Sequence, residues 1–335
     1  MKIENIRPFI GQHCETTATG TLLLQLGIDL SEPMLFGLGE GLGFIFWKMK
    51  TMDFPFIGGR VKTDMLTQNL AKNLNLDLVA VETASAQKAW DGVKQLIDEG
   101  KAVGLKLDCY YLDYFSNPFH FAGHYVAIYG YDDENAYLID TEQQGSRVKT
   151  SLKSLAMARA EKGPMSSKNL YYILNETGKE TDMRTAIITS VRNNASIYIN
   201  PPISNIGYKG ILKTAKELGK WFDTTKDITG DFATTAMLME RAGTGGALFR
   251  NLYRDFLKES YELLKIDILN QAYDQFSEIA ALWTEVSNLF LEVSKTKDRE
   301  YILKASEILK QVSVKEKDTM EQLFKFLPDV MSIKN

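Results

Sequence analysis

Hydrophobic and polar residues recur with short helical and strand periods through the first half of the chain. Ala18, Leu22 and Leu26 lie four residues apart, which predicts a helix, and Gly27 stands where a helix C-cap would fall. Two further helices are expected over residues 64–73 and 86–97. Apolar stretches bounded by turn residues predict strands. These expected strands cover residues 44–49, 76–81, 101–108, 124–132, 136–140 and 170–174.

The pattern changes after residue 182. The segment 183–202 is rich in β-branched residues, but its apolar positions recur every four residues, so we expect a helix that Pro201 ends. Long helical periods continue from Tyr208 onward, and no internal repeat is visible. A chain of 335 residues is long for one core. We therefore expect an α+β domain over residues 1–176 and a mainly α-helical domain over residues 177–335.

Composition narrows the possible functions. The 43 acidic residues outnumber the 39 basic ones and no basic block stands out, which argues against a nucleic-acid partner. The N-terminus lacks the apolar core of a signal peptide, and the most apolar later stretch, residues 34–47, is interrupted by Glu40 and too short for a bilayer. With only two cysteines and no disulfide framework, we expect a cytoplasmic protein with reduced thiols and no membrane partner.

One of the two cysteines, Cys14, directly precedes the first expected helix. The unpaired N–H groups and the dipole at a helix start favour thiolate over thiol, more so beside a cationic histidine. The alternative is a small buried residue that packs like alanine, which is the usual fate of free cysteine.

A candidate base and its orienting carboxylate lie further along the chain. His124 opens one expected strand, and Asp140 closes the next after the turn DDEN at residues 132–135. A hairpin brings its open ends together, so His124 and Asp140 are expected to be neighbours. Each residue alone has an ordinary explanation, as a strand-end histidine or a turn-capping aspartate. Together with Cys14 they follow the Cys, His, Asp order of papain-like cysteine enzymes.

Three stretches carry a resemblance to a known family: HCETTATGTLL from residue 13, LSEPMLFGLGEGLGF from residue 30 and GHYVAIYGYDDENAYLIDT from residue 123. They resemble the N-terminal domain of the butirosin biosynthesis protein H family. Residues 239–257, MERAGTGGALFRNLYRDFL, look like the helical domain usually joined to it. The resemblance covers nearly the whole chain. It implies a papain-like fold related to bacteriocin-leader peptidases.

The resemblance also implies an activity, which is transfer of an acyl group from a carrier-protein thioester to an amine acceptor. Cys14 would be the nucleophile, His124 the base and Asp140 the orienting residue. The wider papain pattern places an oxyanion-hole glutamine about six residues before the cysteine, where this chain has Pro8. Gln12 is the nearest substitute, beside the Cys14 backbone N–H. The neighbouring His13 is a further candidate for tuning the thiol.

The glycine-rich stretch FGLGEGLG at residues 36–43 matches no nucleotide-binding fingerprint. It is either a tight bend that needs positive φ angles or a cleft wall along which a phosphopantetheine arm lies. In the second case Gly39 and Gly41 would line the cleft. Glu32 and Glu40 would then contact a substrate amine.

Other residues raise alternatives with less support. His120 and His124 are four residues apart, which suggests zinc, but no metal-binding motif accompanies them and we expect no metal. Cys109 is expected to be a packed thiol, and its neighbour Asp108 is a possible cleft residue. The stretch RAGTGG at residues 241–246 is either an anion site with Arg241 and Arg250 or a turn capped by Thr244.

These observations favour cysteine-dependent acyl transfer in natural-product biosynthesis, with no cofactor of its own. The alternatives are a cysteine hydrolase or peptidase, in which water replaces the amine, and an inert binding or scaffold protein. The expected partners are a small-molecule or peptide amine and an acyl carrier protein. The helical domain is expected to wall one side of the Cys14 cleft, to form a homodimer, or both.

Overall fold

The computed structural model describes residues 1–49, 52–116, 119–163 and 165–327. The chain forms two compact units, Met1–Leu35 with Leu70–Thr181, and Phe36–Asn69 with Asp182–Asn335. The expected division into residues 1–176 and 177–335 differs from these units in two respects, the first being that the boundary follows Thr181 instead of residue 176. Residues 36–69 lie within the expected α+β part of the sequence but pack with the helices of the second unit.

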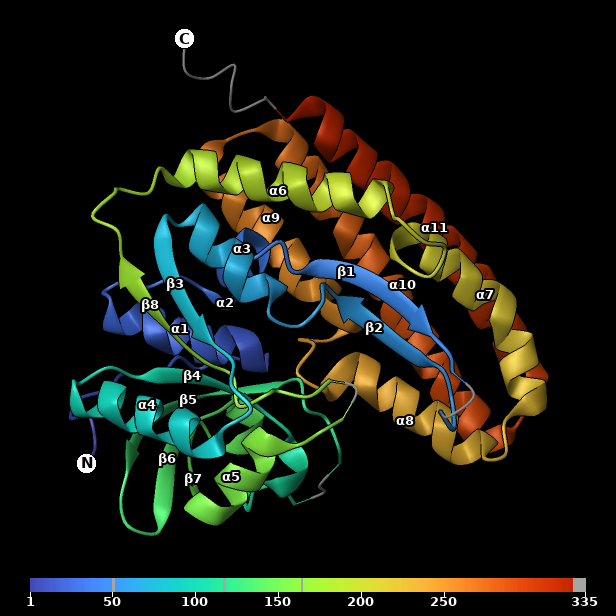
Figure 1. The fold of residues 1–335 in the computed structure, drawn as a ribbon. Helices are drawn as coiled ribbons and strands as arrows, with labels where there is room; N and C mark the ends of the chain where they lie inside the picture. Colours follow the sequence, from blue (N-terminus) through green and yellow to red (C-terminus); the bar gives the residue numbers. More distant parts are fainter. Residues whose placement is uncertain (50–51, 117–118, 164, 328–335) are drawn as a thin grey trace. The chain divides into compact units, whose positions relative to one another are not determined.

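The first unit is built on an antiparallel sheet with the strand order β3-β8-β4-β5-β6-β7 among the described residues (Figure 1). Its strands are β3 (Leu76–Val81), β4 (Val103–Leu107), β5 (His124–Tyr131), β6 (Asn135–Ile139), β7 (Arg147–Ser151) and β8 (Tyr171–Glu176). The helices of this unit are α1 (Cys14–Gln25), α4 (Ala86–Asp98) and α5 (Leu152–Ala160). The short 3₁₀ turns η1 (Cys109–Tyr111) and η2 (Glu142–Gln144) connect strands.

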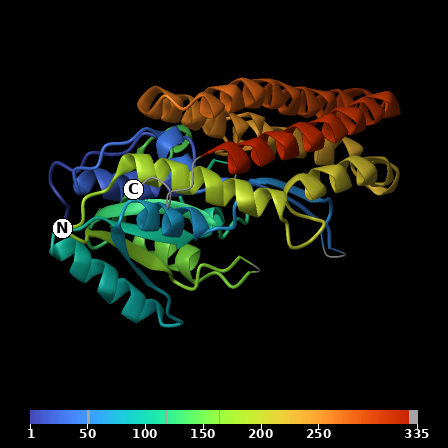
Figure 2. The ribbon, with the colours of Figure 1, turned by 90° about the horizontal axis from the view of Figure 1, so that it is seen from above.

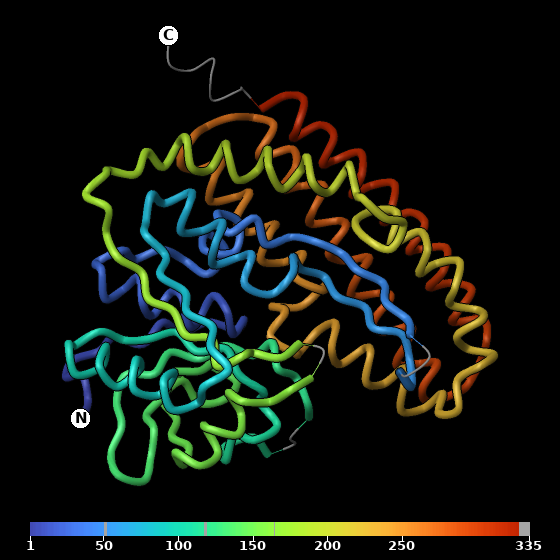
Figure 3. The backbone as a smooth tube through the Cα atoms, viewed as in Figure 1, coloured from blue at the N-terminus to red at the C-terminus, as the bar shows by residue number. Residues whose placement is uncertain are grey.

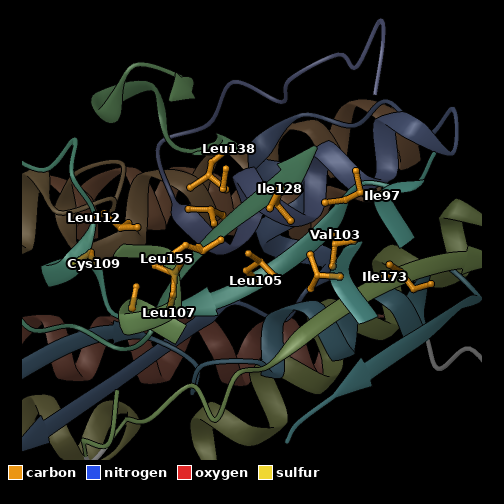
Figure 4. Packing of buried hydrophobic residues seen from close by; sticks show 14 residues of the cluster. Ile97, Val103, Leu105, Leu107, Cys109, Leu112, Ile128, Leu138, Leu155 and Ile173 are labelled. Carbon is orange, nitrogen blue, oxygen red and sulfur yellow. The ribbon is translucent and has the colours of Figure 1, made fainter. Parts of the chain in front are cut away.

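Helices cover both faces of this sheet. On one face, a side chain at Gly104 of β4 would collide with the ring of Tyr172 in β8, and the Tyr172 hydroxyl lies 3.0 Å from Thr19 Oγ1 of α1. On the other face, Val103 and Leu105 of β4 join the main apolar core together with residues of α4 and α5 (Figure 4). Helix α1 therefore packs on the face opposite to α4 and α5, because alternate residues of a strand point to opposite faces.

The second unit is mainly helical, as expected. It contains α6 (Met183–Ile199), α7 (Gly207–Thr224), α8 (Ile228–Arg241), η3 (Ala247–Phe249), α9 (Arg250–Leu264), α10 (Asp267–Thr296) and α11 (Arg299–Phe326). The two longest helices, α10 and α11, run side by side (Figure 2). In α10, Trp283, Phe290 and Val293 lie on one face of the helix and are fully enclosed. Among the residues described, no helix is both long and apolar enough to cross a bilayer.

A hairpin from the first half of the sequence completes the second unit. Strands β1 (Leu42–Trp47) and β2 (Phe56–Arg60) pair antiparallel, and β1 packs against α7 (Figure 3). Asn205, just before α7, exchanges hydrogen bonds with the Phe46 backbone. Helices α2 (Glu32–Leu38) and α3 (Met65–Asn73) begin in one unit and end in the other.

The sequence pattern predicted most of these elements but missed α2, β2, β7 and α5. Strand β2 has the sequence FIGGR, and two glycines argue against a strand when only local preference is considered. One of these glycines, Gly59, is required by a residue far along the chain. A Cβ at Gly59 would lie 2.3 Å from the carbonyl oxygen of Leu248. Distant packing therefore fixes this strand.

Candidate functional site

The candidate site lies at one end of the sheet in the first unit. Strand β4 ends at Leu107, which pairs with His124 at the start of β5, and β6 ends at Ile139 immediately before Asp140. Since neighbouring strands run antiparallel, the end of β4, the start of β5 and the end of β6 lie together. The hairpin expected from the sequence thus brings the His124 and Asp140 side chains to the same place.

His124 and Asp140 form a buried pair. The Nε2 atom of His124 lies 2.8 Å from Oδ2 of Asp140, and the Asp140 side chain is fully enclosed. The carboxylate has two more donors, because the Tyr114 hydroxyl donates to Oδ2 at 2.7 Å and the Thr141 backbone N–H donates to Oδ1 at 2.7 Å. The Phe115 ring meets the imidazole edge to face, with centroids 5.5 Å apart. These contacts fix the imidazole orientation.

Tyr114 and Thr141 were not predicted from the sequence. Thr141 follows Asp140 directly, so its N–H was a possible partner from the start, whereas Tyr114 lies in a loop whose path depends on tertiary packing. Burial and the negative charge of Asp140 raise the pKa of Tyr114 well above its ordinary value. Tyr114 therefore stays a neutral hydroxyl that donates to the carboxylate.

Cys14 was expected directly before the first helix; it is the first residue of α1 and is 7% exposed. The helix packs against β5 and β4, which carries its N-terminus to the His124 end of the sheet. Burial alone would lower the pKa of His124, but the charges of Asp140 and Cys14 and hydrogen bonds with both outweigh burial and raise it to about 10. Since Nε2 is engaged by Asp140, Nδ1 is the ring nitrogen of His124 that does not contact this carboxylate.

The chain immediately before Cys14 is held by Glu32. Its carboxylate accepts from the Gln12 N–H at 2.9 Å, the His13 N–H at 2.8 Å and the Thr16 hydroxyl at 2.7 Å. Glu32, for which a contact with a substrate amine was predicted, thus secures the start of α1. Gln12 bonds Glu32 only through its backbone N–H, and the residue is exposed to solvent. His13 is buried and is the N-cap residue of α1.

The remaining predicted cleft residues, Gly39, Glu40 and Gly41, form the turn after α2 in the second unit. Glu40 has a positive φ of 54°, and its carboxylate accepts from the Asn193 side chain at 3.0 Å. A Cβ at Gly41 would lie 2.7 Å from the Phe36 ring. These contacts describe a tight bend, and the positive φ in it is that of Glu40.

The second cysteine, Cys109, lies near the candidate site, and His120 has a partner of its own. The pKa of Cys109 is raised to about 12, first by burial and then by the charges of Asp108, Cys14 and Asp140, and its thiol donates to the Phe119 carbonyl. His120 Nδ1 lies 2.9 Å from Asp108 Oδ2. Asp108 is therefore the partner of His120. In the parts of the chain described, no group of three or more His, Cys, Asp or Glu side chains has a metal-binding arrangement.

Of the two alternatives for the RAGTGG stretch, an anion site or a turn, its hydrogen bonds support the turn. Thr244 does not cap α9, because the N-cap residue of this helix is Phe249. The Thr244 hydroxyl donates to the Met239 carbonyl and accepts from the Gly246 N–H. The Ala247 N–H already donates to the Glu240 carboxylate. Arg250 binds Glu316 through two hydrogen bonds of 2.8 and 2.9 Å, and both side chains are fully buried. The segment is a structural turn.

Comparison with known proteins gives two family matches. Residues 13–141 match the family described as butirosin biosynthesis protein H, N-terminal. Residues 153–323 match a family described as a domain of unknown function (DUF4872). No curated protein matches the chain. The first match covers Cys14, His124 and Asp140.

Proposed function

Because residues 13–141 match the N-terminal domain of butirosin biosynthesis protein H, we propose that the chain is a biosynthetic enzyme that transfers an acyl group through a cysteine thioester. In this proposal Cys14 is the nucleophile, His124 the general base and Asp140 the residue that orients the imidazole. The acyl donor is a thioester on the phosphopantetheine arm of a carrier protein, and the acceptor is an amine. The first unit then acts as a papain-like catalytic domain.

One observation carries the proposal, namely that the His124 imidazole interacts with Asp140 on one side and Cys14 on the other. A nucleophile, a base and an orienting carboxylate in this relation are the parts that covalent acyl transfer requires. The position of Cys14 at the start of a helix adds backbone N–H groups that have no intrahelical partner. The Cys14 N–H among them would donate to the oxyanion of a tetrahedral intermediate.

The first half-reaction loads the enzyme. The Cys14 sulfur, as thiolate, attacks the thioester carbonyl carbon and forms a new C–S bond. When the tetrahedral intermediate collapses, the bond to the pantetheine sulfur breaks and the His124 imidazolium gives its proton to that sulfur. The products are acyl-Cys14, neutral His124 and the free carrier thiol. The hydrogen bond from His124 to Asp140 persists throughout.

The second half-reaction releases the product. An amine attacks the acyl-Cys14 carbonyl, and neutral His124 accepts the proton that the amine nitrogen loses. Collapse breaks the bond to the Cys14 sulfur, which leaves an amide, the thiolate and the imidazolium. A hydrolase would follow the same steps with water in place of the amine, so the two functions differ in the second half-reaction.

The test is capture of the acyl-enzyme. The full chain is mixed with an acyl N-acetylcysteamine thioester, which mimics the end of a pantetheine arm, and quenched in acid. Intact mass and peptide mapping are expected to show one acyl group on Cys14. A panel of primary amines is then added, and the ratio of amide to free acid is measured.

Two variants control the experiment. Cys14→Ala is expected to abolish the adduct, whereas Cys109→Ala, which removes the other thiol, is expected to keep it. An acyl-enzyme that gives only free acid with every amine supports the hydrolase instead of the transferase. The absence of any adduct on Cys14 of the folded wild-type protein overturns the cysteine mechanism and favours the scaffold alternative.

A further inference from the structure

The chain buries two arginines in very different surroundings. Arg250 in the second unit is fully enclosed and paired with the Glu316 carboxylate. Arg159, at the end of α5 in the first unit, is only 3% exposed, yet it faces no carboxylate among the described residues. Its Nη2 atom makes long hydrogen bonds to the Ala89 and Asn169 carbonyls, at 3.4 and 3.3 Å, and its buried Nε has no partner.

Burial lowers the pKa of Arg159 to about 10, so the guanidinium remains charged at neutral pH. A buried cation that has lost its water is costly unless an anion or several strong acceptors replace that water. Arg159 makes only two long hydrogen bonds to neutral carbonyls, and its Nε–H has no acceptor. These contacts do not replace the water that the buried guanidinium has lost. Since no carboxylate among the described residues faces Arg159, its guanidinium is suited to binding an anion from outside the chain.

A cavity adjoins the guanidinium. Arg159 and Asn169 line a space of about 200 Å³ between α4 and α5. Its other walls are largely apolar, with Trp90 from α4 and Leu152 and Leu155 from α5. One water molecule occupies roughly 30 Å³ in the liquid, so the cavity has room for a small organic molecule.

The start of α4 adds a second source of positive potential. Ala86 and Gln87, the first two residues of this helix, also line the cavity. The Ser85 side chain caps the Lys88 N–H, while N–H groups at the first turn of a helix have no intrahelical partner and attract anions. The helix start and the unpaired guanidinium thus favour the same kind of ligand.

The acidic groups near these elements are already engaged. Glu82, just before α4, pairs with Lys168 at 3.3 Å. Asp91, one turn into α4, pairs with Lys94 at 3.1 Å and accepts from the Gln87 side chain. These two carboxylates are thus committed to other partners.

We propose that this cavity is a binding site for a small carboxylic acid with an apolar body. The carboxylate meets Arg159 and the start of α4, and the hydrocarbon part packs on Trp90, Leu152 and Leu155. The apolar walls favour an organic carboxylate over inorganic phosphate, which would leave them empty or wet. The cavity lies on the face of the sheet opposite α1, so this site is distinct from the Cys14 site.

Benzoate is the probe, because it combines a carboxylate with a compact apolar ring. The full chain is labelled with ¹⁵N-tryptophan, which gives four indole signals, and Trp90→Phe assigns the one from the cavity. Millimolar benzoate is expected to shift the Trp90 signal saturably. Benzamide, a neutral analogue of the same shape, is expected to bind at least about tenfold more weakly, since it lacks the charge-assisted hydrogen bond.

Three variants locate the site. Arg159→Met is expected to abolish the shift, and Lys153→Met, which removes an exposed cation from the same helix, is expected to preserve it. Ala156 is an exposed residue of the cavity lining, so Ala156→Phe is expected to block binding while Arg159 remains. This variant decides the matter if Arg159→Met does not fold.

Each outcome bears on the proposal. Saturable binding of benzoate that is lost in Arg159→Met or Ala156→Phe supports it. No saturable shift of the Trp90 signal in the folded wild-type protein overturns it, and so does binding that survives in Ala156→Phe. Tighter binding of inorganic phosphate than of benzoate overturns the assignment to organic carboxylates. The activity of Cys14 is not measured here, so these results are independent of the proposed acyl transfer.

Discussion

Replacing Asp140 by asparagine is expected to lower the pKa of His124 sharply. The substitution keeps the size of the side chain and an oxygen that accepts from Nε2, but it removes a unit negative charge 2.8 Å from that nitrogen. Two unit charges about 4 Å apart interact by about 4 kcal/mol at an effective dielectric constant near 20. Since one pKa unit corresponds to about 1.4 kcal/mol, the pKa of His124 is expected to fall by about two to three units from its value of about 10.

The assay is a histidine titration by NMR. The chain has three histidines, so selective labelling gives three ring signals that substitution can assign. Asp108→Asn is the matched control, because it removes the carboxylate beside His120 and is expected to leave the His124 titration unchanged. If His124 titrates near 6.5 in the wild-type protein, or identically in Asp140→Asn, Asp140 does not stabilise the imidazolium and the reasoning fails.

The same shift has a consequence for stability. The pKa of His124 is higher in the folded protein than the 6.5 of a free histidine. Protonated His124 therefore stabilises the fold fully below pH 6.5, and this contribution is lost as the pH rises towards about 10. In Asp140→Asn the loss is expected at lower pH. Denaturant unfolding at several pH values checks the direction.

Three further changes test other parts of the molecule. His124→Ala is expected to reduce kcat/KM by roughly 10²–10⁴-fold, more than Asp140→Asn, because the base takes part in every proton transfer; near-native turnover would remove His124 from the mechanism. Iodoacetamide at mildly acidic pH is expected to label Cys14 before Cys109, whose pKa is about 12, and the reverse order in a peptide map would contradict the nucleophile assignment. Glu316→Gln leaves the buried Arg250 without its counter-charge and is expected to lower the free energy of unfolding by about 3–5 kcal/mol. Urea unfolding would show this as a lower midpoint, whereas an unchanged midpoint would mean that the ion pair adds no stability.

Local pattern was enough to predict the parts of the site that depend on topology. Cys14 begins a helix whose apolar residues recur every four positions, and two apolar strands joined by a short turn bring His124 and Asp140 together. The partners of these residues were harder to predict. Tyr114 reaches Asp140 from a loop, and Glu32 reaches the start of α1 from a helix that the glycine-rich pattern concealed. Such contacts depend on tertiary packing, which periodicity does not encode.

The missed helix α5 illustrates the same limit. Its sequence LKSLAMARA buries Ser154 and Arg159 together with Leu155 and Ala158, so apolar and polar residues are not separated into two faces. Periodicity detects helices through that separation. The residue that made the helix hard to recognise is Arg159, the buried cation of the proposed carboxylate site.

The β5–β6 hairpin carries His124 and Asp140 on one continuous segment, and this has an evolutionary consequence. Surface turns are where insertions and deletions are usually tolerated. Here the turn after β5 sets the register of β6, and a slip of one residue would send Asp140 to the opposite face of the sheet. The Asp132 carboxylate pins that turn by accepting from the Glu134 and Asn135 N–H groups. A single-codon deletion between residues 132 and 135 would therefore separate Asp140 from His124 and also turn the buried Ala136 and Leu138 of β6 away from the core, so fold and site together constrain the length of this turn.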